Sequence, residues 1–149
     1  MSRTIPRTLR RGLALAWALP NTSLGLCLLA IAVLTGGRAA RVGYVLEAHG
    51  GVLQRLLTCG SLSHLGIAAV TLGHVVLAPS ASELDLFRAH ERVHVGQCER
   101  WGPLFLPAYA AASLWALLRR ADPYRDNWFE RQAFASSERA ERGGGPVLP

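Results

Sequence analysis

The feature that most constrains this chain is the run HERVH at residues 90–94, in which two histidines stand one helical turn apart. Ser80 and Glu83 have the spacing of a helix capping box, and Gly102 followed by Pro103 is a stop signal. The sequence therefore predicts a helix that begins at Ser80 and carries the run near its middle. Because positions i and i+4 project from one helix face, both imidazoles point in the same direction.

His90 and His94 can thus offer imidazole nitrogens to a single metal ion, and Zn²⁺ accepts such nitrogens at about 2.0–2.1 Å. Glu91 lies about 100° around the helix from His90. In that position its carboxylate can take a proton from metal-bound water. We predict zinc ligands at His90 and His94 and a general base at Glu91. The alternative interpretation is a pair of ordinary surface histidines on an amphipathic helix.

A tetrahedral zinc ion that keeps one water needs a third protein ligand. Glu99 is five residues past His94, and it points away from the metal face of the helix. Glu130 is the better candidate, because a predicted helix over residues 104–120 can lead away from the site and a final helix, starting near Asn127, can return to it. The alternative for Glu130 is a capping partner of Asn127, three residues earlier.

Aromatic and amide side chains supply the supporting candidates. A hydrogen-bond donor to an oxyanion is expected close to the metal, and Tyr124 is the first choice, followed by Tyr109 and His74. Gln97 comes about one turn after His94, where it can orient that ligand by a hydrogen bond. All three oxyanion candidates also have ordinary structural interpretations.

The remaining pattern indicates short strands. Residues 41–47 alternate between apolar and other side chains and predict a strand, residues 49–51 predict a turn, and residues 52–57 predict the returning strand of a hairpin. Residues 70–77 are compact and β-branched, so we predict one further strand that ends before Pro79.

The strand predicted over residues 70–77 has a second potential use. An edge strand before the metal-binding helix can pair with an extended peptide through main-chain hydrogen bonds. We predict that Leu72, Gly73 and His74 form this substrate strand, since Gly73 permits close backbone approach. The alternative is an internal strand that is covered on both sides.

Residues 13–34 are apolar except for the interruption Pro20–Ser23, and their length is roughly that of one bilayer crossing. Arginines at residues 3, 7, 10 and 11 precede them, as is common next to a membrane segment. We predict a retained membrane-associated segment. A cleaved signal sequence and a buried or interfacial helix are the alternatives.

Composition narrows the remaining classes. The 149 residues suit one domain with tails. All 16 basic residues are arginine and they are scattered along the chain, so no nucleic-acid partner is expected. The three cysteines, Cys27, Cys59 and Cys98, show no CxxC spacing, which argues against both a disulfide framework and a thiolate metal site.

Three stretches together resemble the gluzincin metallopeptidases, in particular their minimal bacterial form: residues 72–77, residues 90–97 and residues 127–133. The resemblance implies zinc bound by His90, His94 and Glu130, with Glu91 as the base. It also implies an α+β fold, in which a small zincin-like domain has a short sheet followed by the HExxH helix and a glutamate-bearing helix, and an apolar N-terminal helix precedes them.

The expected organisation is a membrane-associated segment over residues 1–37, a zincin-like domain over 38–136 and a disordered tail over 137–149. The expected function is zinc-dependent hydrolysis of a peptide or protein substrate at a membrane, the inner membrane in a bacterium, with the side undetermined. The alternative is a non-enzymatic membrane-associated protein with a structural zinc site. Hydrolysis of a non-peptide amide is a third, weaker interpretation.

Overall fold

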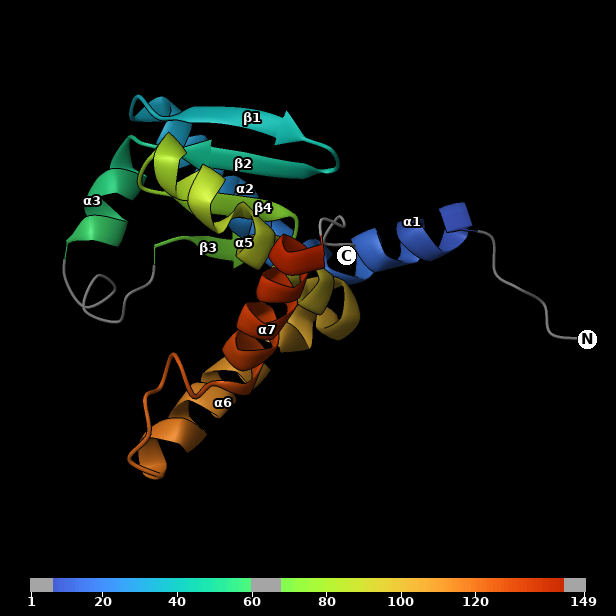
Figure 1. Ribbon diagram of the computed structural model, residues 1–149. Coiled ribbons are helices and arrows are strands. Elements are labelled where there is room, and N and C mark those ends of the chain that lie inside the picture. Colours follow the sequence, from blue (N-terminus) through green and yellow to red (C-terminus); the bar gives the residue numbers. More distant parts are fainter. Residues whose placement is uncertain (1–6, 60–67, 144–149) are drawn as a thin grey trace, which may run out of the picture.

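A computed structural model describes residues 7–59 and 68–143 of the chain (Figure 1). Its helices and 3₁₀ turn are α1 (Arg7–Trp17), α2 (Leu19–Leu34), α3 (Val52–Thr58), α5 (Ala81–Trp101), η1 (Gly102–Leu104), α6 (Phe105–Leu118) and α7 (Trp128–Gly143). Its strands are β1 (Arg38–Val42), β2 (Val45–His49), β3 (Val70–Leu72) and β4 (Val75–Ala78). The fold is therefore α+β, as predicted.

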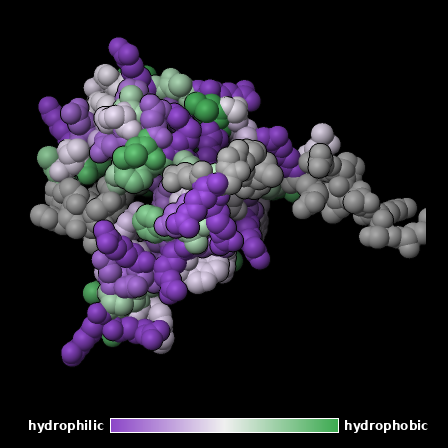
Figure 2. Space-filling view, viewed as in Figure 1, coloured by the Kyte–Doolittle hydropathy of each residue, from purple (hydrophilic) through white to green (hydrophobic). Residues whose placement is uncertain are grey.

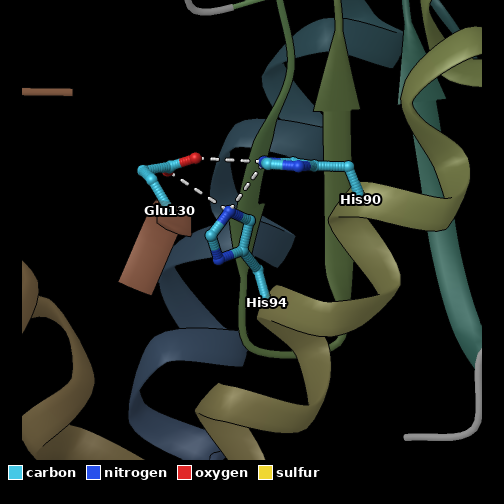
Figure 3. Close-up of side chains that lie close together, drawn as sticks. All are labelled: His90, His94 and Glu130. Carbon is cyan, nitrogen blue, oxygen red and sulfur yellow. Dashed lines mark hydrogen bonds and ion pairs between the residues drawn. The ribbon is translucent and has the colours of Figure 1, made fainter. Parts of the chain in front are cut away.

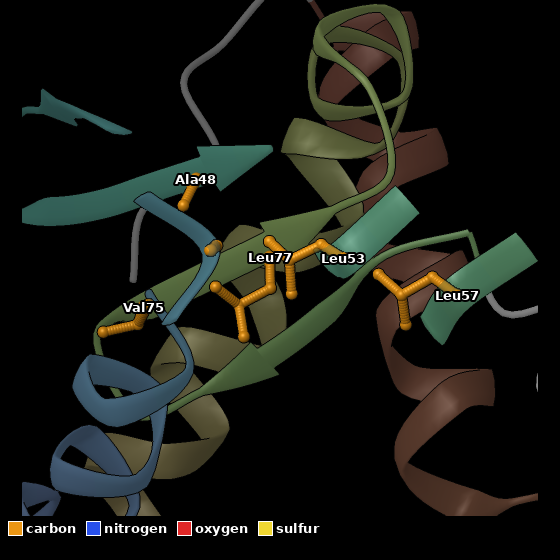
Figure 4. Close-up of a cluster of buried hydrophobic side chains, with 6 residues drawn as sticks. Ala48, Leu53, Leu57, Val75 and Leu77 are labelled. Carbon is orange, nitrogen blue, oxygen red and sulfur yellow. The ribbon is translucent and has the colours of Figure 1, made fainter. Parts of the chain in front are cut away.

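The four strands form one mixed sheet in the order β1-β2-β4-β3. The pairs β1–β2 and β3–β4 are antiparallel, and β2–β4 is parallel. Side chains alternate between the faces of the buried strand β4, because successive residues of a strand point to opposite sides. Val75 and Leu77 pack with α2 and α3, whereas Val76 and Ala78 pack towards α5. The sheet thus lies between two helical layers (Figures 1 and 4).

The predictions of one continuous strand over residues 41–47 and another over residues 70–77 are both wrong. Each is a hairpin with a two-residue turn, Gly43-Tyr44 in the first and Gly73-His74 in the second. Gly43 and Gly73 have φ of +67° and +63°, the left-handed conformation that tight hairpin turns require and glycine adopts without strain. In both segments the glycine is thus the residue at which the chain reverses direction.

The predicted returning strand over residues 52–57 is also wrong, because this segment forms helix α3. Leu53 and Leu57 are buried against the sheet, and they are four residues apart, on one helix face. The predicted turn before it is confirmed at Gly50 and Gly51, which both have positive φ. Residues 52–58 are therefore helical because a helix, unlike a strand, buries both leucines on one face.

Helix α5 begins and ends where the capping signals predicted. The Ser80 hydroxyl oxygen accepts a hydrogen bond from the Glu83 backbone N–H at 3.3 Å, and Gly102 follows the last residue with φ of +55°. The helix is tied to the sheet by buried Glu47 on β2, whose carboxylate accepts hydrogen bonds from Arg88 and Arg92. The HERVH run is thus carried by a helix fixed across the sheet.

The apolar N-terminal segment is bent by 67° between α1 and α2. Helix α2 packs against the sheet, where Gly25 and Ala32 are buried. The polar interruption makes internal contacts: the Asn21 side-chain amide donates to the Gly102 carbonyl at 2.7 Å, and the Thr22 hydroxyl lies 3.2 Å from His74 Nδ1. The polar residues thereby join α2 to the β3–β4 turn and to the start of η1.

Two stretches have the length and composition of a membrane span. One is the continuous helical run Ala81–Leu118, which contains an 18-residue apolar window, and the other is the bent pair α1–α2 taken together. Among the residues that the structure describes, no other helix meets this test.

The predicted disordered tail over residues 137–149 is wrong in its first part, because α7 continues to Gly143. Residues 144–149 lie outside the described residues, as do residues 1–6, which include the first predicted flanking arginine, and residues 60–67.

Replacement of Asn21 by Ala should destabilise the fold by about 1–3 kcal/mol, because the buried Gly102 carbonyl loses its donor. The matched control is Ser23→Ala, since the Ser23 hydroxyl is exposed and donates only within α2. The control should stay within about 0.5 kcal/mol of the parent. Denaturant unfolding of the three proteins in detergent measures both changes, and equal stabilities would contradict the assigned contact.

Candidate metal centre

Three buried side chains from two helices converge on one point (Figure 3). His90 and His94 project from α5, and Glu130 projects from the first turn of α7. The two Nε2 atoms are 3.1 Å apart, and the Glu130 carboxylate oxygens lie 3.1 Å from His90 Nε2 and 3.3 Å from His94 Nε2. The structure thus brings together all three residues predicted as ligands.

These separations match those of ligand atoms that share a small metal ion. Nitrogens bound to tetrahedral zinc at 2.0–2.1 Å are about 3.3–3.4 Å apart. One ligand atom from each of His90, His94 and Glu130 lies within 4.8 Å of the other two. The group can therefore hold a metal ion with little rearrangement of the backbone.

Gln97 fixes the orientation of the His94 ring. Its Oε1 lies 2.8 Å from His94 Nδ1, and its amide nitrogen donates to the Phe129 carbonyl at 3.0 Å and to Gln132 Oε1 at 2.9 Å. Because both amide hydrogens point to α7, Oε1 is left to accept from Nδ1–H of His94. This assigns the tautomer in which His94 Nε2 carries a lone pair towards the metal position.

The His90 ring is held mainly by packing. The ring lies beside Phe134 of α7, with centroids 4.6 Å apart and the two planes tilted by 51°. His90 Nδ1 is buried and has no hydrogen-bond partner within the described part of the chain. His90 Nε2 is consequently the nitrogen that makes all of this ring's polar contacts, and it faces Glu130 and His94.

Asn127, not Glu130, caps helix α7. Its side-chain oxygen accepts from the Phe129 N–H at 2.9 Å, and its amide nitrogen donates to the Tyr109 carbonyl and to the Ser113 hydroxyl. These bonds fix α7 against α6. Glu130 is left to point at the histidines, so the two interpretations of this carboxylate are resolved in favour of the converging site.

The charges in the site are strongly coupled. Burial raises the pKa of Glu130, but hydrogen bonds from His90, His94 and Tyr109 outweigh it and lower the pKa to about 2. For His94, burial lowers the pKa, whereas the carboxylates of Glu130 and Glu91 raise it by more, and the net shift is upwards. In the metal-free site the two groups therefore stabilise each other's charged forms, which lowers the pKa of Glu130 and raises the pKa of His94.

A pocket of about 230 Å³ opens beside the three residues. Its walls are the β3 edge, the start of α6 and the converging side chains; the lining residues are Ala69, Val70, Thr71, Leu72, Glu91, His94, Phe105, Leu106, Tyr109, Tyr124 and Glu130. Most of this lining is apolar. The predicted base Glu91 is thus in the pocket wall, beside His94.

Two contacts in the pocket were not predicted as first choices. The Thr71 hydroxyl donates to Glu91 Oε2 at 2.6 Å, and the Tyr109 hydroxyl donates to Glu130 Oε1 at 2.7 Å. Tyr124, the predicted oxyanion donor, lines the same pocket. The sequence indicated a role for Thr71 only weakly, through the presence of one polar residue in an apolar strand. Tyr109 joins the site through a long-range contact that local spacing does not reveal.

Part of the predicted substrate strand is wrong. Leu72 is on the edge strand and lines the pocket, but Gly73 and His74 form the turn that follows it. His74 is buried, its Nε2 lies 3.0 Å from Glu99 Oε1, and it is not among the residues that line the pocket. Thr22 of α2 covers this turn. His74 is therefore a turn residue and not part of the predicted strand.

No protein-family profile matches the chain, and no curated protein or solved structure is significantly similar to it. The site is therefore described by its own geometry. The chain is an α+β protein in which the buried residues His90, His94 and Glu130 can hold a metal ion.

Replacement of His94 or Glu130 by Ala should reduce bound metal from about one ion per chain to none, because two remaining ligands leave the coordination incomplete. Elemental analysis after dialysis against zinc measures this. The matched control is Glu138→Gln, since that carboxylate is on α7 but exposed. Loss of metal in the control, or retention in both ligand variants, would contradict the site.

The metal-free protein should lose stability in acid through Glu130. Because its folded pKa of about 2 is below the ordinary value of 4.5, its contribution is present above about pH 4.5 and disappears as the pH falls towards 2. Glu130→Gln should flatten the stability profile in this window. Denaturant unfolding of chelator-treated protein measures it, and a parallel profile in the variant would oppose the assignment.

Proposed function

We propose that this chain is a zinc-dependent peptidase, with His90, His94 and Glu130 as the metal ligands and Glu91 as the general base. The observation that carries the proposal is the convergence of three buried ligand atoms at zinc-like separations beside a pocket that contains Glu91. The zincin-type arrangement of an HExxH helix and a glutamate-bearing helix supports the same interpretation.

The number of ligands favours catalysis over a purely structural role. Structural zinc sites are usually closed by four protein ligands, whereas catalytic sites have three and leave one position for water or substrate. In the described part of the chain the cluster comprises His90, His94 and Glu130 alone. The adjoining pocket gives the open position a place for a substrate.

Bound zinc would supply a water molecule of lowered pKa and a positive charge that polarises a carbonyl. In this proposal Glu91, which lines the pocket, would accept the proton from that water, and the hydrogen bond from the Thr71 hydroxyl would orient its carboxylate. Glu91 can then deliver the proton to the departing amine. Thr71 acts as a positioning residue for this base.

Tyr109 and Tyr124 are the candidate donors to an oxyanion. Burial and the nearby Glu130 carboxylate raise the pKa of both phenols. Both hydroxyls therefore keep their protons at neutral pH and can donate hydrogen bonds. In the present arrangement the Tyr109 hydroxyl donates to Glu130, and the Tyr124 hydroxyl also lies close to that carboxylate.

The pocket suits an extended peptide with an apolar side chain. Strand β3 is at the edge of the sheet, so among the described strands one side of its backbone has no partner, and an extended peptide could pair there. Phe105 and Leu106 form the opposite, apolar wall. We further propose membrane association through the apolar residues 13–34, whose outer face on α2 is exposed and includes Leu24 and Ile31.

A structural metal site is the second candidate, and the packing of α7 against α5 across the triad favours it. In that case a chelator should unfold the C-terminal helices while no peptide is hydrolysed with metal present. A peptidase should hydrolyse peptides and lose activity on chelation even where its fold persists. A thermal melt with and without chelator, run beside a peptide-library digest, separates the two.

Replacement of Glu91 by Gln should leave the bound metal unchanged and reduce peptide turnover by at least about 100-fold, because the general base is lost. Asp85→Asn is the matched control, since Asp85 is exposed on the same helix. Turnover of a peptide library and metal content are measured on all three proteins. A Glu91→Gln variant that retains full turnover would remove Glu91 from the mechanism.

A further inference from the structure

Helix α6 has an outward face without polar side chains. Its two polar residues are both used internally: the Tyr109 hydroxyl donates to Glu130, and the Ser113 hydroxyl accepts from Asn127. In the last two turns the large apolar residues are open to solvent, and these are Leu114, Trp115, Leu117 and Leu118, with exposed fractions of 56, 62, 57 and 70%. A helix on the surface of a water-soluble domain normally turns a polar face outwards.

These four side chains form one continuous surface. At about 100° per residue they cover an arc of roughly 160° on one side of the helix. Ala116, on the opposite side, is buried. The end of α6 lies at the extremity of the molecule farthest from the sheet (Figure 1). The apolar arc is therefore placed where an extended flat surface can reach it.

Arginines follow this arc directly. Arg119, Arg120 and Arg125 are exposed, and within the described residues their guanidinium groups make no hydrogen bond or ion pair, although their backbone N–H groups bond within the helix end and the loop. The Arg119 guanidinium lies 6.0 Å from the centre of the Trp115 ring. In Figure 2 long hydrophilic side chains stand beside hydrophobic ones at this extremity.

The two acidic residues of the same loop do not offset these arginines as contact groups. Asp122 Oδ1 accepts hydrogen bonds from the Tyr124 and Arg125 backbone N–H groups, and Asp126 Oδ2 accepts from the Asp122 N–H. Both carboxylates thus stabilise the loop. The guanidinium groups are left to bind external anions next to an apolar surface.

We propose that the end of α6 and the arginine-bearing loop form a surface that binds an anionic lipid bilayer. We call it the α6 surface: Leu114, Trp115, Leu117, Leu118, Arg119, Arg120 and Arg125. The leucines enter the upper acyl region, Trp115 lies at the level of the headgroups, and the guanidiniums bind lipid phosphates. At 14 residues, α6 is about 21 Å long. This is shorter than a hydrocarbon core of about 30 Å, so the α6 surface enters one leaflet.

This placement has a consequence for the substrate, which rests on the proposed function. Helix α6 supplies Phe105, Leu106 and Tyr109 to the pocket wall, and the loop supplies Tyr124. The pocket and the α6 surface are thus parts of one helix–loop unit. The substrate class that fits is an apolar peptide segment next to or within the membrane, which reaches the β3 edge from the bilayer.

The test places one fluorescent reporter on the full chain. Cys27 and Cys59 are exposed and are replaced by Ala and Ser, whereas buried Cys98 remains. Leu114→Cys is labelled with a nitrobenzoxadiazole dye, and Leu86→Cys, which replaces a 72% exposed leucine on α5, is the matched control. Both proteins are reconstituted into phosphatidylcholine vesicles with or without phosphatidylglycerol.

We expect the dye at residue 114 to shift its emission to the blue, to be quenched by doxyl-labelled lipid and to be protected from iodide. The dye at residue 86 should show none of these effects. Protection at residue 114 should be lost without phosphatidylglycerol, and also in the Arg119→Gln, Arg120→Gln double variant.

Equal iodide quenching at residues 114 and 86 would overturn the proposal. A blue shift that depends on protein concentration without lipid would also overturn it, in favour of a second copy of the chain. Protection that is unchanged in phosphatidylcholine alone would overturn the proposed preference for an anionic bilayer, because phosphatidylcholine has no net charge. Because the dye reports position and not turnover, its result is independent of the Glu91→Gln experiment.

Discussion

The mutual burial of His90, His94 and Glu130 is the interaction on which the rest of the structure depends. An isolated ionised side chain in a protein interior is very costly, and it is tolerated when it is paired and hydrogen-bonded. Here two imidazoles contact the buried Glu130 carboxylate, so its charge has hydrogen-bonding partners on the other helix. The same contacts join α7 to α5. The site and the packing of α7 against α5 therefore depend on the same contacts.

Polar contacts from separate elements hold this arrangement in place. Gln97 orients one imidazole, Asn127 fixes the start of α7, and Tyr109 binds the carboxylate from α6. The pocket walls are anchored in turn by α2, because Asn21 and Thr22 contact the start of η1 and the β3–β4 turn. The apolar N-terminal helix is thus part of the framework around the site. Its outer face, like that of α6, remains apolar and exposed.

Comparison of the sequence with the fold shows which sequence patterns predicted the secondary structure correctly. Capping signals at both ends of α5 were informative, since a cap satisfies backbone groups that belong to the helix itself. The hairpin at Gly73 was missed because its two-residue turn lies inside an apolar run. Residues 52–57 were mistaken for a strand, since a short apolar run fits both periodicities. There the sheet surface that buries Leu53 and Leu57 decides in favour of a helix.

The sequence by itself determined that two histidines and a glutamate share one helix, because residues 90–94 and the cap at Ser80 are local features. It also indicated Glu130 as the best third ligand, since a final helix can return that residue to the site. Tertiary structure alone decided that Tyr109 would bind Glu130 and that Thr71 would hold the predicted base. Such contacts join residues on different elements, and the packing of helices and sheet sets their geometry, which spacing along the chain does not encode.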